Sequence, residues 1–114
     1  MNKIQVTARA AIHEGKLEEF KALAAECMRK ACEKGSGTLQ YDWFLNEAQT
    51  ECVVREAYKD SEAVLEHVAN LGATLGAILA ISDCTFEVLG SPSPKLIEAT
   101  AGLRLKVYSP FQSM

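Results

Sequence analysis

The sequence predicts one α+β domain of 114 residues, built as a sheet covered by helices on one face. Apolar residues recur at every second position in some segments, which is typical of half-buried strands. They recur at every third or fourth position in others, which is typical of amphipathic helices. The predicted order is βαββαβ followed by a further helix and strand. The first six elements favour a split βαβ arrangement, a four-stranded antiparallel sheet with its helices on one side.

The first two elements have the clearest patterns. Apolar and polar residues alternate from Ile4 to Ile12, which predicts a strand with one apolar face. Helical spacing then begins near Lys16, and Gly35 and Gly37 are expected to end this first helix.

Two further alternating segments with a short polar turn between them predict an antiparallel hairpin. Asp60 or Ser61 is expected to cap the next helix. We divide the chain into a core at about residues 3–90 and an extension at about 92–114. The remaining predicted elements are a helical piece at 73–81, a strand from 83 to 89, a short helix at 95–101 and a last strand at 103–107.

Composition excludes several classes of protein. Apolar residues make up 48% and charged residues 24%, as in ordinary globular proteins, and the net charge is −3 without a basic cluster. We therefore expect no binding to nucleic acid, which requires several basic groups on one face. The weakly polar stretch at 71–81 is too short to span a bilayer, and no signal peptide is visible. The sequence predicts a cytoplasmic protein with no membrane association.

The four cysteines, Cys27, Cys32, Cys52 and Cys84, are interpreted as reduced, buried thiols. They form no CxxC motif, and only two histidines accompany them. Their spacing does not match a zinc site, so no metal site is expected.

One-sided helix cover leaves the other face of the sheet bare. That face carries Tyr41, Trp43 and Tyr58, or else their neighbours Phe44 and Ala57. We expect a homodimer to bury it, with a contact that includes the strand of Tyr41 and Trp43. The C-terminal strand is expected to reach the partner's sheet edge, and the alternative is an edge strand added to its own chain.

The segment from Glu56 to His67 carries the best catalytic candidates. A strand ends in a carboxylate and an aromatic residue, Tyr58, and a capped helix bearing His67 follows. An imidazole with a pKa near neutrality, next to a carboxylate and a phenol, is suited to act as a general base. The alternative is that His67 is a packed helix residue with no catalytic part.

Four other residues are candidates for substrate binding. Tyr41 and Trp43 alternate on one strand, where they either fill the core or form a flat apolar wall for an aromatic substrate. Arg9 and Asn46 are weaker candidates for binding an anion, because most polar strand residues are simply solvated.

The run E-x-Y-K-D-x-x-A-x-L-x-H, from Glu56 to His67, resembles the central signature of the antibiotic biosynthesis monooxygenase (ABM) family. The helix start at Gly15–Phe20, the Gly37-x-x-x-Tyr41 segment and the ending at Lys106–Phe111 agree with it. The resemblance implies a ferredoxin-like protomer in a dimeric α+β barrel. It also implies oxidation of phenols or quinols by dioxygen without flavin, haem or metal.

Other family members degrade haem with an Asn on the first strand together with a Trp and a His. Here the first strand offers Gln5, Thr7 and Arg9 instead, and Tyr58 follows the signature Glu. The resemblance therefore favours the oxidation of phenols over the degradation of haem.

The sequence thus leads to two hypotheses. The first is a cofactor-independent monooxygenase that oxidises quinols or polycyclic phenols with dioxygen. Its base or orienting group is His67, Tyr58 is its catalytic partner, and Tyr41, Trp43 and Glu56 contact the substrate. The second is a non-catalytic dimeric module that binds a small aromatic ligand or a partner. Convergence of His67 and a tyrosine on one enclosed pocket would favour the first.

Overall fold

The structure is a computed structural model that describes residues 2–34 and 36–114. The predicted stop of the first helix at Gly35 lies outside the described residues. The elements are β1 (Ile4–Ile12), α1 (Leu17–Lys34), β2 (Thr38–Leu45), β3 (Glu51–Tyr58), α2 (Ser61–Leu71), α3 (Ala73–Leu79), β4 (Ser82–Leu89), α4 (Pro94–Ala99) and β5 (Leu105–Tyr108). Their order and type confirm the predicted α+β class, with boundaries that differ by a few residues. In the described part of the chain, no helix is long and apolar enough to cross a membrane.

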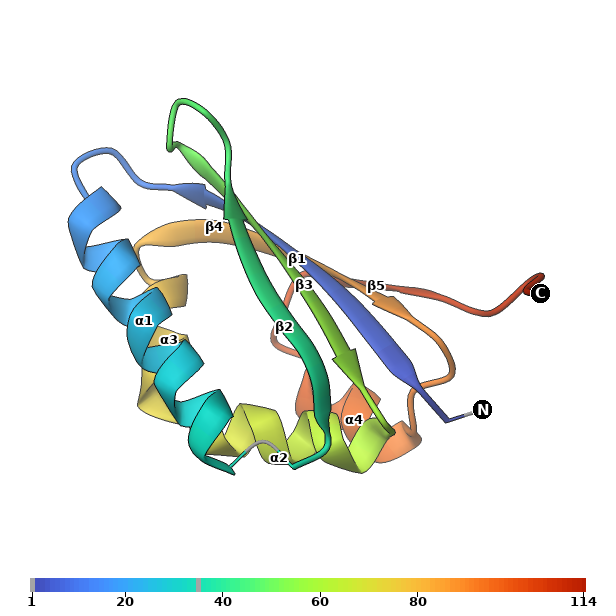
Figure 1. The fold of residues 1–114 in the computed structure, drawn as a ribbon. Coiled ribbons are helices and arrows are strands. Elements are labelled where there is room, and N and C mark those ends of the chain that lie inside the picture. The colour runs from blue at the N-terminus through green and yellow to red at the C-terminus, as the bar shows by residue number, and fades with distance from the viewer. Residues whose placement is uncertain (1, 35) are drawn as a thin grey trace.

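The strands form one five-stranded sheet in the order β2-β3-β1-β4-β5. The pairs β2–β3, β3–β1 and β1–β4 are antiparallel, and β5 runs parallel to β4. Helices α1 to α4 lie on one side of this sheet, as Figure 1 shows. The expected ferredoxin-like arrangement, extended by α4 and β5, is therefore confirmed.

The register decides which aromatic residues face the helices. Tyr41 pairs with Glu56 and Trp43 pairs with Val54, and all four of these side chains line the space between sheet and helices. The intervening Phe44 pairs with Val53 and is 55% exposed. The bare face therefore carries Phe44 and Ala57, the second of the two predicted sets. The sequence left both sets open because alternation shows which residues share a face but not which face the helices cover.

β5 pairs with β4 of its own chain, in a register that places Phe86 opposite Leu105. This pairing corresponds to the predicted alternative, in which the last strand is added to the sheet edge of its own chain rather than exchanged between subunits. The chain leaves β4 at Gly90, whose φ of 137° suits glycine, and a Cβ there would meet the Lys3 carbonyl oxygen at 2.9 Å. The short helix α4 then returns the chain to its own sheet edge, so no partner is needed to complete the pairing.

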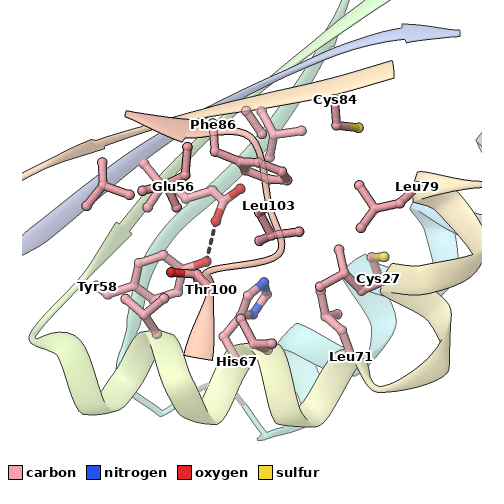
Figure 2. A pocket seen from close by; sticks show the side chains of 18 of the residues that line it. Cys27, Glu56, Tyr58, His67, Leu71, Leu79, Cys84, Phe86, Thr100 and Leu103 are labelled. Carbon is pink, nitrogen blue, oxygen red and sulfur yellow. Dashed lines mark hydrogen bonds between the residues drawn. The ribbon is translucent and has the colours of Figure 1, made fainter. Parts of the chain in front are cut away.

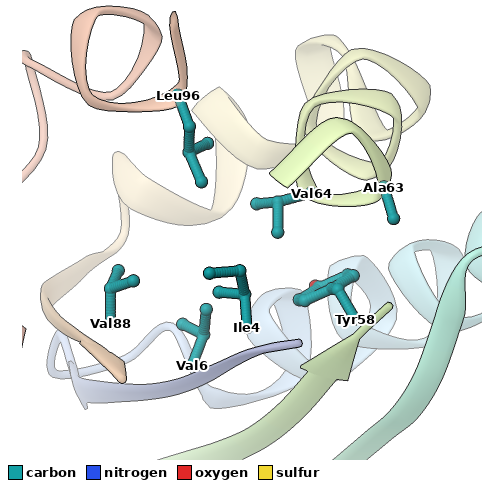
Figure 3. Packing of buried hydrophobic residues seen from close by; sticks show 7 residues of the cluster. All are labelled: Ile4, Val6, Tyr58, Ala63, Val64, Val88 and Leu96. Carbon is teal, nitrogen blue, oxygen red and sulfur yellow. The ribbon is translucent and has the colours of Figure 1, made fainter. Parts of the chain in front are cut away.

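Two clusters of buried side chains form the core. One contains Ile4, Val6, Tyr58, Ala63, Val64, Val88 and Leu96, and Figure 3 shows sheet residues of this cluster facing α2 and α4. The other contains Ala8, Ala10, Phe20, Cys52, Val54, Ile78 and Ile81. Members of both clusters line the same cavity, so the core and the candidate site are continuous.

All four cysteines are free, but their burial differs from the expectation. Cys27 and Cys52 are buried, Cys84 is half-buried and Cys32 is exposed. Cys32 follows the buried Ala31 in α1, and successive helical residues point in different directions.

Candidate functional site

A cavity of about 100 Å³ lies between the inner face of the sheet and the helices. Every strand and every helix contributes side chains to its lining, and nearly all of them are apolar. The polar exceptions include Glu56, Tyr58 and His67, which Figure 2 shows gathered in one part of the cavity. Three residues of one short sequence segment are thus brought together in a largely apolar setting.

Glu56 and Tyr58 project from β3 to the same side, because alternate residues of a strand share a face. The Tyr58 hydroxyl donates a hydrogen bond of 2.5 Å to Glu56 Oε1. The Tyr58 side chain is fully buried, so this bond holds the carboxyl against a rigid partner. Glu56 is partly buried and turned into the cavity.

The environment shifts the proton affinity of both groups. Burial raises the pKa of Glu56 to about 7, while the hydrogen bond from Tyr58 opposes part of that rise. Burial also raises the pKa of the Tyr58 hydroxyl, and the neighbouring Glu56 carboxyl raises it further. Around neutral pH, Glu56 therefore exchanges a proton readily whereas Tyr58 remains a hydrogen-bond donor.

His67 is placed by the start of α2. Asp60 is the predicted cap, and its carboxylate accepts a 2.8 Å hydrogen bond from the Ala63 backbone N–H. Two turns later, His67 stands on the buried side of the helix with 5% of its surface exposed. Figure 2 shows the imidazole rising from α2 into the cavity.

The imidazole of His67 is neutral at physiological pH. Burial lowers its pKa to about 4, well below the value that an exposed histidine would have. The ring packs edge-on against Tyr41 at 4.7 Å between centroids and lies tilted against Tyr58 at 5.4 Å. No described residue forms a hydrogen bond with its Nδ1 atom. The near-neutral titration expected of His67 is thus wrong, because the surrounding apolar groups disfavour the imidazolium.

Tyr41 and Trp43 line the cavity and also pack against the second core cluster, so their placement agrees with both interpretations of the sequence, core filling and an aromatic wall. Their rings meet edge-on at 5.6 Å, and Trp43 also contacts Phe20 at 6.2 Å between centroids. Burial raises the pKa of Tyr41, so its hydroxyl keeps its proton. Trp43 Nε1 is buried without a hydrogen-bond partner among the described residues.

Arg9 and Asn46 do not belong to this cavity. Arg9 is exposed on the opposite face of the sheet, where its guanidinium lies 3.8 Å from Glu87. Asn46 stabilises the β2–β3 turn, since its Oδ1 accepts hydrogen bonds from the backbone N–H groups of Thr50 and Glu51. Arg9 thus points away from the helices, and Asn46 lies just after β2, where it holds the turn.

Sequence reasoning missed the contribution of the C-terminal extension. Leu96 and Ile97 of α4, Thr100, Leu103 and two residues of β5 line the cavity. Leu103, labelled in Figure 2, lies in the turn between α4 and β5, which its backbone N–H closes by donating to the Thr100 carbonyl. The apolar alternation at 103–107 was a signal for a strand, but the parallel pairing with β4 that brings it to the cavity was not visible.

Within residues 2–34 and 36–114, no group of three or more His, Cys, Asp or Glu side chains is arranged to hold a metal ion.

Comparison with known proteins places the chain in a family. The family model described as antibiotic biosynthesis monooxygenase matches residues 4–73. No curated protein sequence matches significantly.

Among solved structures, MupZ from Pseudomonas fluorescens is similar over 100% of this chain and 94% of its own, with 25% identity and a TM-score of 0.86. SnoaB, a cofactor-independent oxygenase from Streptomyces nogalater, is similar over 82% of this chain and 96% of its own, with 14% identity and a TM-score of 0.68. A conserved protein from Methanosarcina mazei Go1 is similar over 77% of this chain and 91% of its own, with 17% identity and a TM-score of 0.68.

The last two likenesses, below 25% identity, concern the fold alone. The family model, in contrast, covers more than half of the chain and includes the segment from Glu56 to His67. The chain therefore belongs to the antibiotic biosynthesis monooxygenase family.

Proposed function

We propose that this protein is a cofactor-independent monooxygenase that oxidises a phenol or quinol with dioxygen. The observation that carries the proposal is the hydrogen-bonded pair Tyr58–Glu56 beside His67 in an apolar cavity. Membership of the family and the fold shared with SnoaB, a cofactor-independent oxygenase, support it. The convergence of His67 with two tyrosines on one cavity also favours an enzyme over a binding module.

Glu56 is the best candidate for the general base. Its pKa of about 7 leaves a large share of the carboxyl ionised at neutral pH, and a base is most effective when its pKa is near the working pH. His67, with a pKa of about 4, is a weaker base. A carboxylate that takes a phenolic proton becomes neutral as the phenolate forms, so the number of charges in the cavity stays at one. Proton transfer to His67 would create two charges in an apolar space.

The remaining polar groups have positioning roles in this scheme. Tyr58 fixes the Glu56 carboxyl through its hydrogen bond, and the neutral His67 offers a hydrogen-bonding atom to the substrate hydroxyl. Tyr41 and Trp43 form the wall against which an aromatic ring packs.

The chemistry balances without an external reductant. Proton transfer to Glu56 gives an electron-rich anion, which passes one electron to dioxygen to form a substrate radical and superoxide. The two recombine into a C–O bond, and protonation gives a hydroperoxide. Loss of water then leaves a carbonyl, so one oxygen atom enters the product and the other leaves as water. The substrate supplies all four electrons that dioxygen accepts.

We also propose that the protein forms a homodimer through the uncovered face of the sheet. The exposed Phe44 lies on this face, and the register puts Val53 opposite it on the neighbouring strand. Thr7, on the same face of β1, is 7% exposed even in the single chain. Light scattering at micromolar concentration tests this proposal, because a monomer there would contradict it.

The decisive experiment for the activity is dioxygen consumption with a panel of quinols and anthrone-like phenols, using metal-chelated protein. We expect uptake of one dioxygen per carbonyl formed and incorporation of one atom from ¹⁸O₂ into the product. Absorption spectra of the same preparation should lack flavin and haem bands. A folded protein that binds these compounds without consuming dioxygen would contradict the proposal and favour the binding module.

A further inference from the structure

Two polar atoms are buried without a hydrogen-bond partner in the described part of the chain, and both belong to side chains that line the cavity. They are His67 Nδ1 and Trp43 Nε1. A buried donor or acceptor without a partner is unfavourable, and native structures contain few of them. For His67 the position is enforced by the capped helix α2, so the ring cannot turn to solvent without disturbing the core. A bound molecule is a direct source of the missing partner.

Charge is the second constraint on that molecule. The lining contains one carboxyl group, Glu56, and among the described residues it contains no Lys or Arg. Lys30 is outside the lining, and its ammonium is engaged by the Leu71 carbonyl and the Thr74 hydroxyl. Arg9 lies on the opposite face of the sheet. An anionic ligand would lose its hydration here without gaining a cation, and it would lie close to Glu56.

Size is the third constraint. A dry cavity of about 150 Å³ in another protein holds benzene. The cavity in this structure, at about 100 Å³, is of the same order, so its volume limits the ligand to about one ring. Leu103 and the other side chains from the C-terminal extension close it on one side.

We propose that the cavity selects an uncharged, single-ring compound whose hydroxyl group hydrogen-bonds to His67 Nδ1. A hydroxyl both donates and accepts, so it satisfies this nitrogen in either tautomer of the imidazole. The inference rests on the proposed function, because it concerns the same cavity and the same class of aromatic hydroxyl substrate. It concerns binding rather than turnover, and it narrows the class to neutral, compact molecules.

Three small molecules of similar shape separate the contributions. p-Cresol is the uncharged phenol, toluene lacks the hydroxyl, and 4-hydroxybenzoate carries a carboxylate in place of the methyl group. We expect p-cresol to bind at least about tenfold more tightly than 4-hydroxybenzoate at pH 7. Titration is followed by the indole N–H signal of Trp43 in ¹⁵N-labelled protein, which is unambiguous because the chain has one tryptophan.

The hydrogen bond itself is tested at the imidazole. On addition of p-cresol, the ¹⁵N chemical shift of His67 Nδ1 should change, whereas toluene should leave it nearly unchanged. His13 is the internal control, since it is the only other histidine and lies at the surface beside Asp83 at 3.2 Å. This measurement uses the parent protein and does not depend on the folding of a variant.

A variant gives a second measure. In His67→Leu, the preference for p-cresol over toluene should fall by at least about fivefold, which corresponds to the loss of one buried hydrogen bond. Equal binding of 4-hydroxybenzoate and p-cresol, an unmoved His67 signal, or failure of p-cresol to bind would each overturn the inference. The expected binding pattern without dioxygen uptake on any quinol would contradict the proposed function and leave this inference standing.

Discussion

The Tyr58 hydroxyl donates to Glu56 Oε1, and the two side chains are alternate residues of the same strand that face one cavity. The bond therefore depends on a single pleat of β3 rather than on the approach of distant segments. It stabilises the ionised carboxyl and so keeps the pKa of Glu56 lower than burial alone would. This pair sets the proton affinity of the cavity near neutrality.

Glu56→Gln should lower turnover on an active quinol by at least about a hundredfold, the lower end of general-base contributions. The amide preserves the shape of the side chain and its contact with Tyr58 but cannot accept the substrate proton. Dioxygen uptake measures the effect, and circular dichroism checks the fold. Glu47→Gln, at an exposed position of the β2–β3 turn, is the matched control and should retain parent activity. Parent-level turnover in folded Glu56→Gln would exclude Glu56 as the base.

Activity should rise with pH through about 7, because Glu56 acts as a base only when ionised. Tyr58→Phe removes the hydrogen bond that favours the ionised form while leaving the ring to pack. The midpoint of the pH profile should therefore move to higher pH in this variant, and turnover at neutral pH should fall. The dependence of kcat/KM on pH in both proteins tests this. An unchanged midpoint would mean that Tyr58 does not control the titrating group.

His67→Ala separates a base from a hydrogen-bonding partner. If Glu56 is the base, the variant should keep a pH midpoint near 7, and KM should increase because a contact to the substrate hydroxyl is lost. Alanine is the best helix former, so α2 should persist. His13→Ala is the surface control. Disappearance of the rise in activity around pH 7 in His67→Ala would assign the base to His67 instead.

The two shifted groups predict opposite effects of pH on stability. The pKa of Glu56 is raised on folding, so its contribution to stability is lost as pH rises from about 4.5 towards about 7. The pKa of His67 is lowered, so its contribution is lost as pH falls from about 6.5 towards about 4. Relative to the parent, Glu56→Gln should gain stability as pH rises through the first range. His67→Leu should gain relative stability as pH falls through the second, and urea unfolding across pH measures both.

Leu103 in the turn before β5 should determine how large a substrate fits. Leu103→Ala removes a side chain that closes the cavity, so kcat/KM for a two-ring quinol should rise relative to a one-ring quinol by about tenfold or more. Lys106→Ala, which changes an exposed side chain of β5, is the control. An unchanged ratio would show that the extension does not limit substrate size.

The order and type of the elements followed from periodicity, since alternation at Ile4–Ile12 and helical spacing after Leu17 are both strong signals. Periodicity also put Glu56 and Tyr58 on one face. It did not distinguish the covered face from the bare one, which depends on where the helices pack. The sequence therefore does not show whether Trp43 or Phe44 faces the helices, and only the strand register answers this.

Protonation was harder to predict than placement. His67 and Glu56 were recognised as neighbours in a signature, but their pKa values depend on burial by residues far away in the sequence. Alternation also placed Arg9 on the polar face of its strand, but the pattern does not show whether that face meets solvent or a cavity. The cavity wall formed by Leu103 required long-range pairing that the sequence pattern does not encode locally.

The parallel pairing of β5 with β4 has a consequence for protein synthesis. The cavity wall draws on residues up to Val107, while Glu56 and His67 both lie within residues 56–67. A ribosome makes the reactive groups first and the wall that encloses them last, and domains begin to fold as they emerge. The nascent βαββαβ unit therefore carries Glu56 and His67 in a cavity that lacks part of its wall until α4 and β5 dock.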